Sequence, residues 1–132
     1  MSNAFYDSVA QVLEVDEVGF DTDFRQIPGW SSLQAFGLLV LMENDWQAPI
    51  GIMRLKEMKT VGDLYQEAFV AFAASLFGVD RASLSPDTSY GSIPAWDSVA
   101  HLRLVMEAEK RFGTSYRLES IPALRTLRDF LV

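Results

Sequence analysis

The chain has 132 residues, of which 49% are hydrophobic and 12% aromatic, and its formal net charge of −7 at pH 7 favours partners with a basic face. The acidic charge argues against binding to a nucleic-acid phosphate backbone, and the absence of cysteine excludes disulfides, thiolate catalysis and zinc–thiolate sites. The longest apolar run, Ala35 to Met42, is far shorter than the roughly 20 residues that span a bilayer, and the N-terminus lacks a signal-peptide pattern, so we expect no membrane span and a cytoplasmic location.

In the first half of the chain, the spacing of apolar residues predicts four helical segments and no strand. The opening helix is expected around Phe5 to Leu13, and a long irregular stretch rich in turn residues follows over 16–31. The next helix is expected to begin at Ser32. A short apolar segment over 52–58 and a helix opened by Thr60, which suits an N-cap, complete this half.

The second half repeats this order at an offset of 66 residues. An opening helix around 68–77 is followed by an irregular stretch over 80–97. A helix is then expected to begin at Ser98 and to end near Gly113, because its apolar stripe stops there. A short segment and a last helix opened by Thr126 follow.

The register of the repeat holds without a gap from the first irregular stretch to the last helix, so it covers a whole folding unit. We therefore expect two modules, residues 1–66 and 67–132. Their junction has no proline, serine tract or charge run, which predicts one near-continuous helix from about 60 to 77, weakened only by Gly62. The expected fold class is all-α, with two tandem four-helix bundles joined by that helix.

The most specific motif of the second module is Ile93-Pro94-Ala95-Trp96-Asp97-Ser98-Val99, followed by an apolar stripe that closes at Phe112-Gly113. This pattern resembles the acyl carrier protein family, in which an Asp-Ser-Leu sequence opens helix II and the serine carries 4′-phosphopantetheine. Here Val99 stands where leucine is usual. The segments over 58–64 and 124–131 also resemble that family's fourth helix, so the resemblance covers essentially both halves.

The resemblance implies that Ser98 is the attachment site and that a phosphopantetheinyl transferase supplies the arm from coenzyme A. Asp97 is implied to help that enzyme position its metal-bound coenzyme A. A helix N-terminus suits the arm's phosphate because its N–H groups are unpaired and carry partial positive charge. The chain would then be a carrier and not an enzyme, with no catalytic residue and no metal site of its own.

The arm would present thioesters to acyl-loading and acyl-processing enzymes, as in fatty acid or polyketide biosynthesis. The arm also brings the thiol that the chain lacks. Whether the cargo is fatty acyl, polyketide or aminoacyl stays open. The alternative function is a carrier-like scaffold or protein-interaction module that binds partners without a prosthetic group.

The first module departs from the motif at Ser31, which replaces the aspartate before Ser32. We therefore expect Ser32 to survive as a helix cap. The alternative is that Ser32 is a second attachment site, which would give a tandem carrier with two arms.

The helix after Ser32 is also more apolar than its counterpart after Ser98. The exchanges are Ala35 for His101, Gly37 for Arg103, Leu41 for Glu107 and Met42 for Ala108. A helix that is apolar all round is normally buried, so we expect this one to be covered by the second module or by another chain. The surface through which carriers usually meet their enzymes would then be lost in the first module. Self-association is expected to use Phe36, Val40 and Leu41.

Two other kinds of site are disfavoured by the sequence. A Ser98–His101 hydrolase would need an acid to orient the imidazole, and the neighbouring Asp97 cannot do so; no Gly-x-Ser-x-Gly elbow exists either. We expect His101 to be a surface histidine that touches partners. Asp21 and Asp23 suggest a cation loop, but the glycine and the glutamate of such loops are missing, which predicts a solvated turn.

Overall fold

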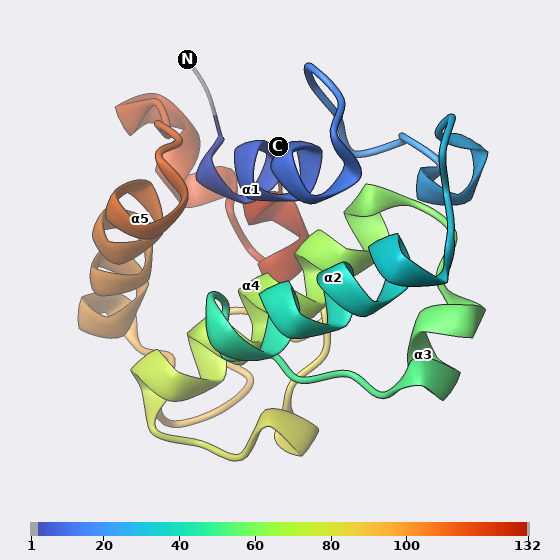
Figure 1. Cartoon of the computed structure of the whole chain (residues 1–132). Helices are drawn as coiled ribbons and strands as arrows, with labels where there is room; N and C mark the ends of the chain where they lie inside the picture. Colours follow the sequence, from blue (N-terminus) through green and yellow to red (C-terminus); the bar gives the residue numbers. More distant parts are fainter. Residues whose placement is uncertain (1–2, 132) are drawn as a thin grey trace. The chain divides into compact units, whose positions relative to one another are not determined.

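The computed structural model describes residues 3–131. Throughout this range the chain forms α-helices and 3₁₀-helices and no β-strand, which confirms the all-α class (Figure 1). The chain divides into two compact units. We call Phe5–Ala68 the N-terminal unit and the chain from Phe69 onward the C-terminal unit.

The N-terminal unit is built around aromatic side chains. Its elements are α1 (Ala4–Leu13), η1 (Phe24–Gln26), α2 (Ser32–Asn44), α3 (Ile52–Glu57) and the first turns of α4 (Val61–Phe77). Phe5 on α1 stacks on Tyr65 of α4 with ring centroids 5.2 Å apart, and it meets Trp46 edge-on at 5.1 Å. The Trp46 indole donates a hydrogen bond to the Ser8 hydroxyl (3.1 Å). These contacts join α1, α4 and the segment after α2 in one core.

The helix α4 spans the range over which the sequence predicts a helix across the junction. Gly62 lies inside it because the loop before η1 comes very close at that point. A Cβ at Gly62 would lie 2.6 Å from the Phe20 ring and 2.7 Å from the Phe20 carbonyl oxygen, to which the Gly62 N–H donates. Close packing, and not a break in the helix, explains this glycine.

The C-terminal unit contains the rest of α4, then η2 (Arg81–Ser83), α5 (Ser98–Phe112), η3 (Leu118–Ala123) and η4 (Leu127–Phe130). Phe69 of α4 packs against Phe112 and Phe130 at 5.4 Å each, which ties α4, α5 and η4 together. The helix α5 begins and ends as predicted, and Gly113 closes it in the left-handed conformation with φ 73°. The last two segments are 3₁₀-helices, and Pro122 within η3 lacks the N–H that an α-helix would use there.

The same hydrogen bonds close the loop onto the last helix in both units, at the offset of the sequence repeat. The matched pairs are Gly19 N–Thr22 Oγ1 (2.8 Å) with Ser85 N–Thr88 Oγ1 (2.9 Å), Val61 N–Thr22 O (2.9 Å) with Leu127 N–Thr88 O (3.2 Å), and Thr60 N–Asp63 Oδ2 (3.1 Å) with Thr126 N–Asp129 Oδ2 (3.0 Å). The repeated side chains therefore make the same local structure in each unit.

Candidate functional site

Ser98 is the first residue of α5, and its hydroxyl is not used to cap the helix. The N-cap is Asp97, whose Oδ1 accepts a hydrogen bond from the Ala100 N–H (2.9 Å). Ser98 is exposed, and within residues 3–131 its side chain has no hydrogen-bond partner. An aspartate at the N-cap thus leaves the neighbouring hydroxyl free at the tip of the helix.

The loop before Ser98 is anchored by Trp96, which is fully buried. The Trp96 ring lies 5.4 Å from the Phe77 ring of α4. The backbone N–H of Trp96 donates to the Ile93 carbonyl (3.1 Å), and its backbone carbonyl accepts from the Gly91 N–H (3.2 Å). The Trp96 indole N–H donates to Nδ1 of His101 (3.1 Å). Ser98 is therefore carried on a well-held corner.

His101 is a core residue, so the expectation of a surface histidine is wrong. Its side chain is buried, Nδ1 accepts from Trp96, and Nε2 lies 3.3 Å from the Ile121 carbonyl oxygen, to which it donates. Both ring nitrogens are thus occupied, and neither serves as a base for Ser98. The signal was in the sequence: His101 shares the inward spacing of Leu104 and Ala108.

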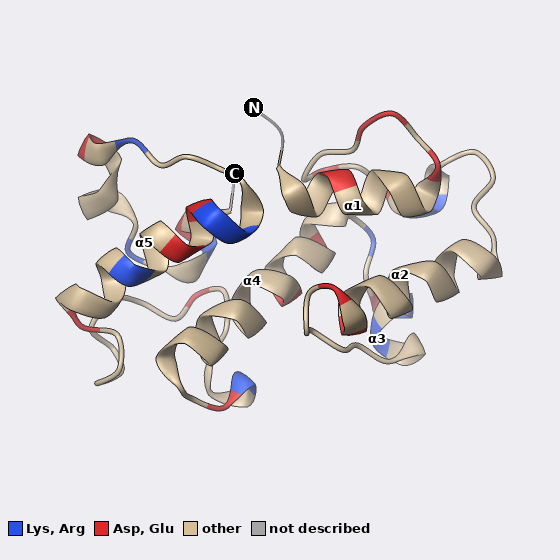
Figure 2. Cartoon of the chain, turned by 60° about the vertical axis from the view of Figure 1, so that its left-hand side comes forward, with Lys and Arg blue, Asp and Glu red and all other residues tan. Residues whose placement is uncertain are grey.

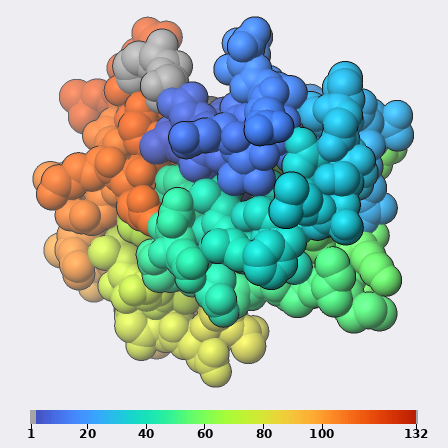
Figure 3. Space-filling view, viewed as in Figure 1, coloured from blue at the N-terminus to red at the C-terminus, as the bar shows by residue number. Residues whose placement is uncertain are grey.

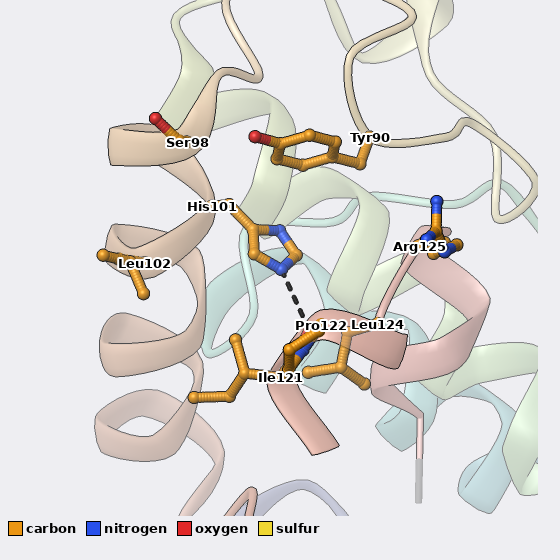
Figure 4. A pocket seen from close by; sticks show the side chains of 8 residues that line it. All are labelled: Tyr90, Ser98, His101, Leu102, Ile121, Pro122, Leu124 and Arg125. Atoms are coloured by element: carbon orange, nitrogen blue, oxygen red, sulfur yellow. Dashed lines mark hydrogen bonds between the residues drawn. The ribbon is translucent and has the colours of Figure 1, made fainter. Parts of the chain in front are cut away.

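A cavity of about 350 Å³ opens beside Ser98 (Figure 4). Ser98 and Leu102 of α5 lie on one side, and Arg125 lies on the opposite side with Tyr90 above. The remaining lining comes from His101, Ile121, Pro122 and Leu124. Its volume lies at the lower end of the range for small-molecule sites. No local pattern in the sequence indicates this cavity, because residues far apart in the chain form it.

An exposed apolar stripe runs along α5 next to the same serine. Val99 is 67% exposed, Leu102 54% and Met106 64%. In Figure 2, blue and red segments alternate with tan ones along α5, whereas α2 is mostly tan, that is, uncharged. The stripe thus begins beside the free hydroxyl and reaches the middle of α5.

The N-terminal unit keeps the same stripe at the corresponding positions of α2. Leu33, Phe36 and Val40 are exposed, and the surface of α2 is open on the face shown in Figure 3. Within the N-terminal unit this outer side of α2 is left exposed. Covering by the second module or by another chain stays a prediction for Phe36 and Val40, but Leu41 is buried and cannot take part.

The prediction that the first module has lost its polar helix face rested in part on core positions. Met42 and its counterpart Ala108 both lie in the core, and His101 is buried where Ala35 stands in the first unit. Two of the four exchanges thus change the core and leave the outer face alone.

Ser32 is the first residue of α2 and is exposed, as Ser98 is on α5. The N-cap position belongs to Ser31, whose side chain makes no capping hydrogen bond. The expectation that Ser32 caps the helix is therefore wrong. The two serines are placed alike, and the aspartate cap of the second is missing in the first.

Within residues 3–131 no group of three His, Cys, Asp or Glu side chains is placed to hold a metal ion. In the same range no helix has the length and apolar character to cross a membrane. Comparison with protein families, characterised proteins and solved structures finds no match to this chain.

Proposed function

We propose that the chain is a carrier protein of two tandem acyl-carrier-like bundles, with 4′-phosphopantetheine attached to Ser98. The observation that carries the proposal is the placement of the Ser98 hydroxyl. It is exposed and unbonded at the first position of α5, while Asp97 performs the capping and Trp96 fixes the loop. These are the properties that a transferase needs in its acceptor.

The residues around Ser98 fit the arm. The N–H groups of the first turn of α5 and the helix dipole favour a phosphodiester on Ser98. The exposed stripe at Val99, Leu102 and Met106 offers an apolar docking face to a phosphopantetheinyl transferase and to acyl-loading and acyl-processing enzymes. When bound, the arm supplies a terminal thiol that holds the cargo as a thioester.

The scaffold alternative is favoured by one observation. The apolar stripe occurs on α2 as well as on α5, although α2 lacks the aspartate cap beside its serine. An apolar stripe that occurs without the capped serine suits the binding of a partner protein without a prosthetic group. The N-terminal unit is where this role applies best.

The test is the intact mass of the protein after incubation with coenzyme A and a broad-specificity phosphopantetheinyl transferase. We expect one addition, lost in Ser98→Ala and kept in the matched control Ser32→Ala. No addition under conditions that modify a known carrier would refute the carrier proposal and favour the scaffold alternative. Two additions, with one lost in each variant, would show that both units carry an arm.

A further inference from the structure

The cavity beside Ser98 is lined by two residues that differ between the units, Tyr90 and His101. In the N-terminal unit Phe24 is fully buried, and the smaller Ala35 stands at the position that corresponds to His101. At the corresponding positions of the C-terminal unit, His101 fills the core and Tyr90 is 41% exposed. The Tyr90 ring meets the imidazole edge-on at 4.9 Å, so it becomes a wall of the cavity.

The two loops share one backbone hydrogen bond and then differ. The N–H of Phe24 donates to the Lys59 carbonyl (3.3 Å), and the N–H of Tyr90 donates to the Arg125 carbonyl (2.6 Å). Phe24 then opens the 3₁₀-helix η1, whereas Tyr90 is followed by Gly91 in the left-handed conformation with φ 80°. The aromatic residue that packs inward and the one that lines a cavity thus differ in the backbone that follows them as well as in their side chains.

The lining of the cavity combines an apolar floor with one cation. The floor consists of Leu102, Ile121, Pro122 and Leu124. Arg125 is the only charged residue of the lining, and its guanidinium has no partner within residues 3–131. By contrast, the nearby Arg128 is paired with Asp87 (2.9 Å). The described lining thus contains one exposed arginine and no carboxylate, although the chain has a net charge of −7.

An apolar pocket with one guanidinium is complementary to an apolar chain that ends in a carboxylate. The Tyr90 ring forms the wall next to that position, and the small volume fits a short chain. We propose that this cavity binds a short acyl chain with a carboxylate at the end distal from its carbonyl attachment, and that Arg125 selects it. If the chain is the carrier proposed above, on which this assignment of cargo rests, the cargo is a dicarboxylic acid bound through one of its carboxyl groups as a thioester.

The first test uses the unmodified protein, so it does not depend on Ser98. The ¹⁵N-labelled protein is titrated with suberic acid monoamide, which has one carboxylate, and with octanamide, which is neutral and of the same length. We expect the carboxylate to shift the amide signals of Tyr90, Leu102 and Ile121 and to bind roughly tenfold more tightly than the amide, as for a hydrogen bond to a charged group.

Arg125→Gln should remove this preference, and Arg125→Lys should keep part of it because the charge remains. The matched control is Lys59→Gln, the corresponding position of the N-terminal unit, which should bind as the wild type does. Equal binding of both ligands, no binding, or an unchanged preference in Arg125→Gln would overturn the proposal.

The second test loads Ser98 with suberyl or octanoyl arms from the corresponding coenzyme A thioesters. We expect the suberyl form to have the higher melting temperature, and Arg125→Gln to abolish the difference. Equal melting temperatures in the wild type would overturn the cargo assignment. If Ser98 takes no arm but the free carboxylate binds, the carrier function fails and the cavity assignment stands.

Discussion

Replacing the buried histidine by alanine tests how the candidate site is held. His101 accepts from the indole of Trp96, which has no exposure to solvent, and it lies 3.3 Å from the Ile121 carbonyl. His101→Ala removes both interactions and leaves a void between α5, η3 and the loop. Alanine is the residue at the corresponding position of the N-terminal unit, Ala35.

The magnitude follows from two contributions. A buried donor left without a partner costs about 1–3 kcal/mol, and Trp96 would be such a donor. The void adds about 2 kcal/mol, at the low end for large-to-small core substitutions. The sum, about 3–5 kcal/mol, is a large part of the roughly 3–9 kcal/mol expected for a unit of about 60 residues.

The assay is urea unfolding of the C-terminal unit, followed by ¹H–¹⁵N NMR through the Trp96 indole signal. We expect a lower unfolding free energy and an upfield shift of that signal in His101→Ala. The control Arg103→Ala, on an exposed position of the same helix, should stay within about 0.5 kcal/mol of the wild type. An unfolding free energy and an indole shift equal to those of the wild type would refute the assigned role of His101.

The exchange between the units makes a sharper prediction. Adding Tyr90→Phe to His101→Ala gives the C-terminal unit the residue types that the N-terminal unit has at Phe24 and Ala35. We expect the second substitution to cost less in the alanine background than in the wild type, with a coupling above about 0.5 kcal/mol. The ligand preference of the cavity should be lost as well, because the aromatic ring would move into the core. Strict additivity in the unfolding measurement would contradict this account.

Two further predictions concern the ends of the repeated unit. Gly62→Ala improves helix propensity by about 1 kcal/mol. Its Cβ would lie 2.6 Å from Phe20, and overpacking of this kind costs about 1–3 kcal/mol. Urea unfolding should therefore show a lower free energy of unfolding, and a more stable variant would contradict the packing of Phe20 against Gly62. Hydrogen bonds from the N–H groups of Thr126 and Arg125 lower the pKa of Asp129 from 3.8, so its stabilisation is present above that value and is lost as the pH falls through the lowered pKa. Asp129→Asn should cost about 1 kcal/mol at pH 7 and less near pH 2, and an equal cost at both values would refute the assignment.

The sequence predicted the elements whose ends have local causes. An aspartate N-cap and a left-handed glycine set the limits of α5, and both act within a few residues of the chain. Gly62 was read as a weak point because helix propensity ignores Phe20, which approaches from another part of the chain. The cavity was missed for the same reason, since its lining combines Tyr90 with Arg125 and η3. Contacts between segments distant in sequence have no signature in a local pattern.

Comparison of the two units shows that three properties of the candidate site, the apolar stripe, the exposed serine and the aspartate cap, do not always occur together. The apolar stripe occurs in both, the exposed serine occurs in both, and the aspartate cap occurs beside Ser98 alone. The exchanges that made α2 look degenerate lie partly in the core, because His101, Ala108 and Met42 are buried. An enzyme that binds through the stripe should therefore bind both units, whereas one that reads the capped loop should act on Ser98. Discrimination between the serines then depends on the cap and the loop and not on the docking face.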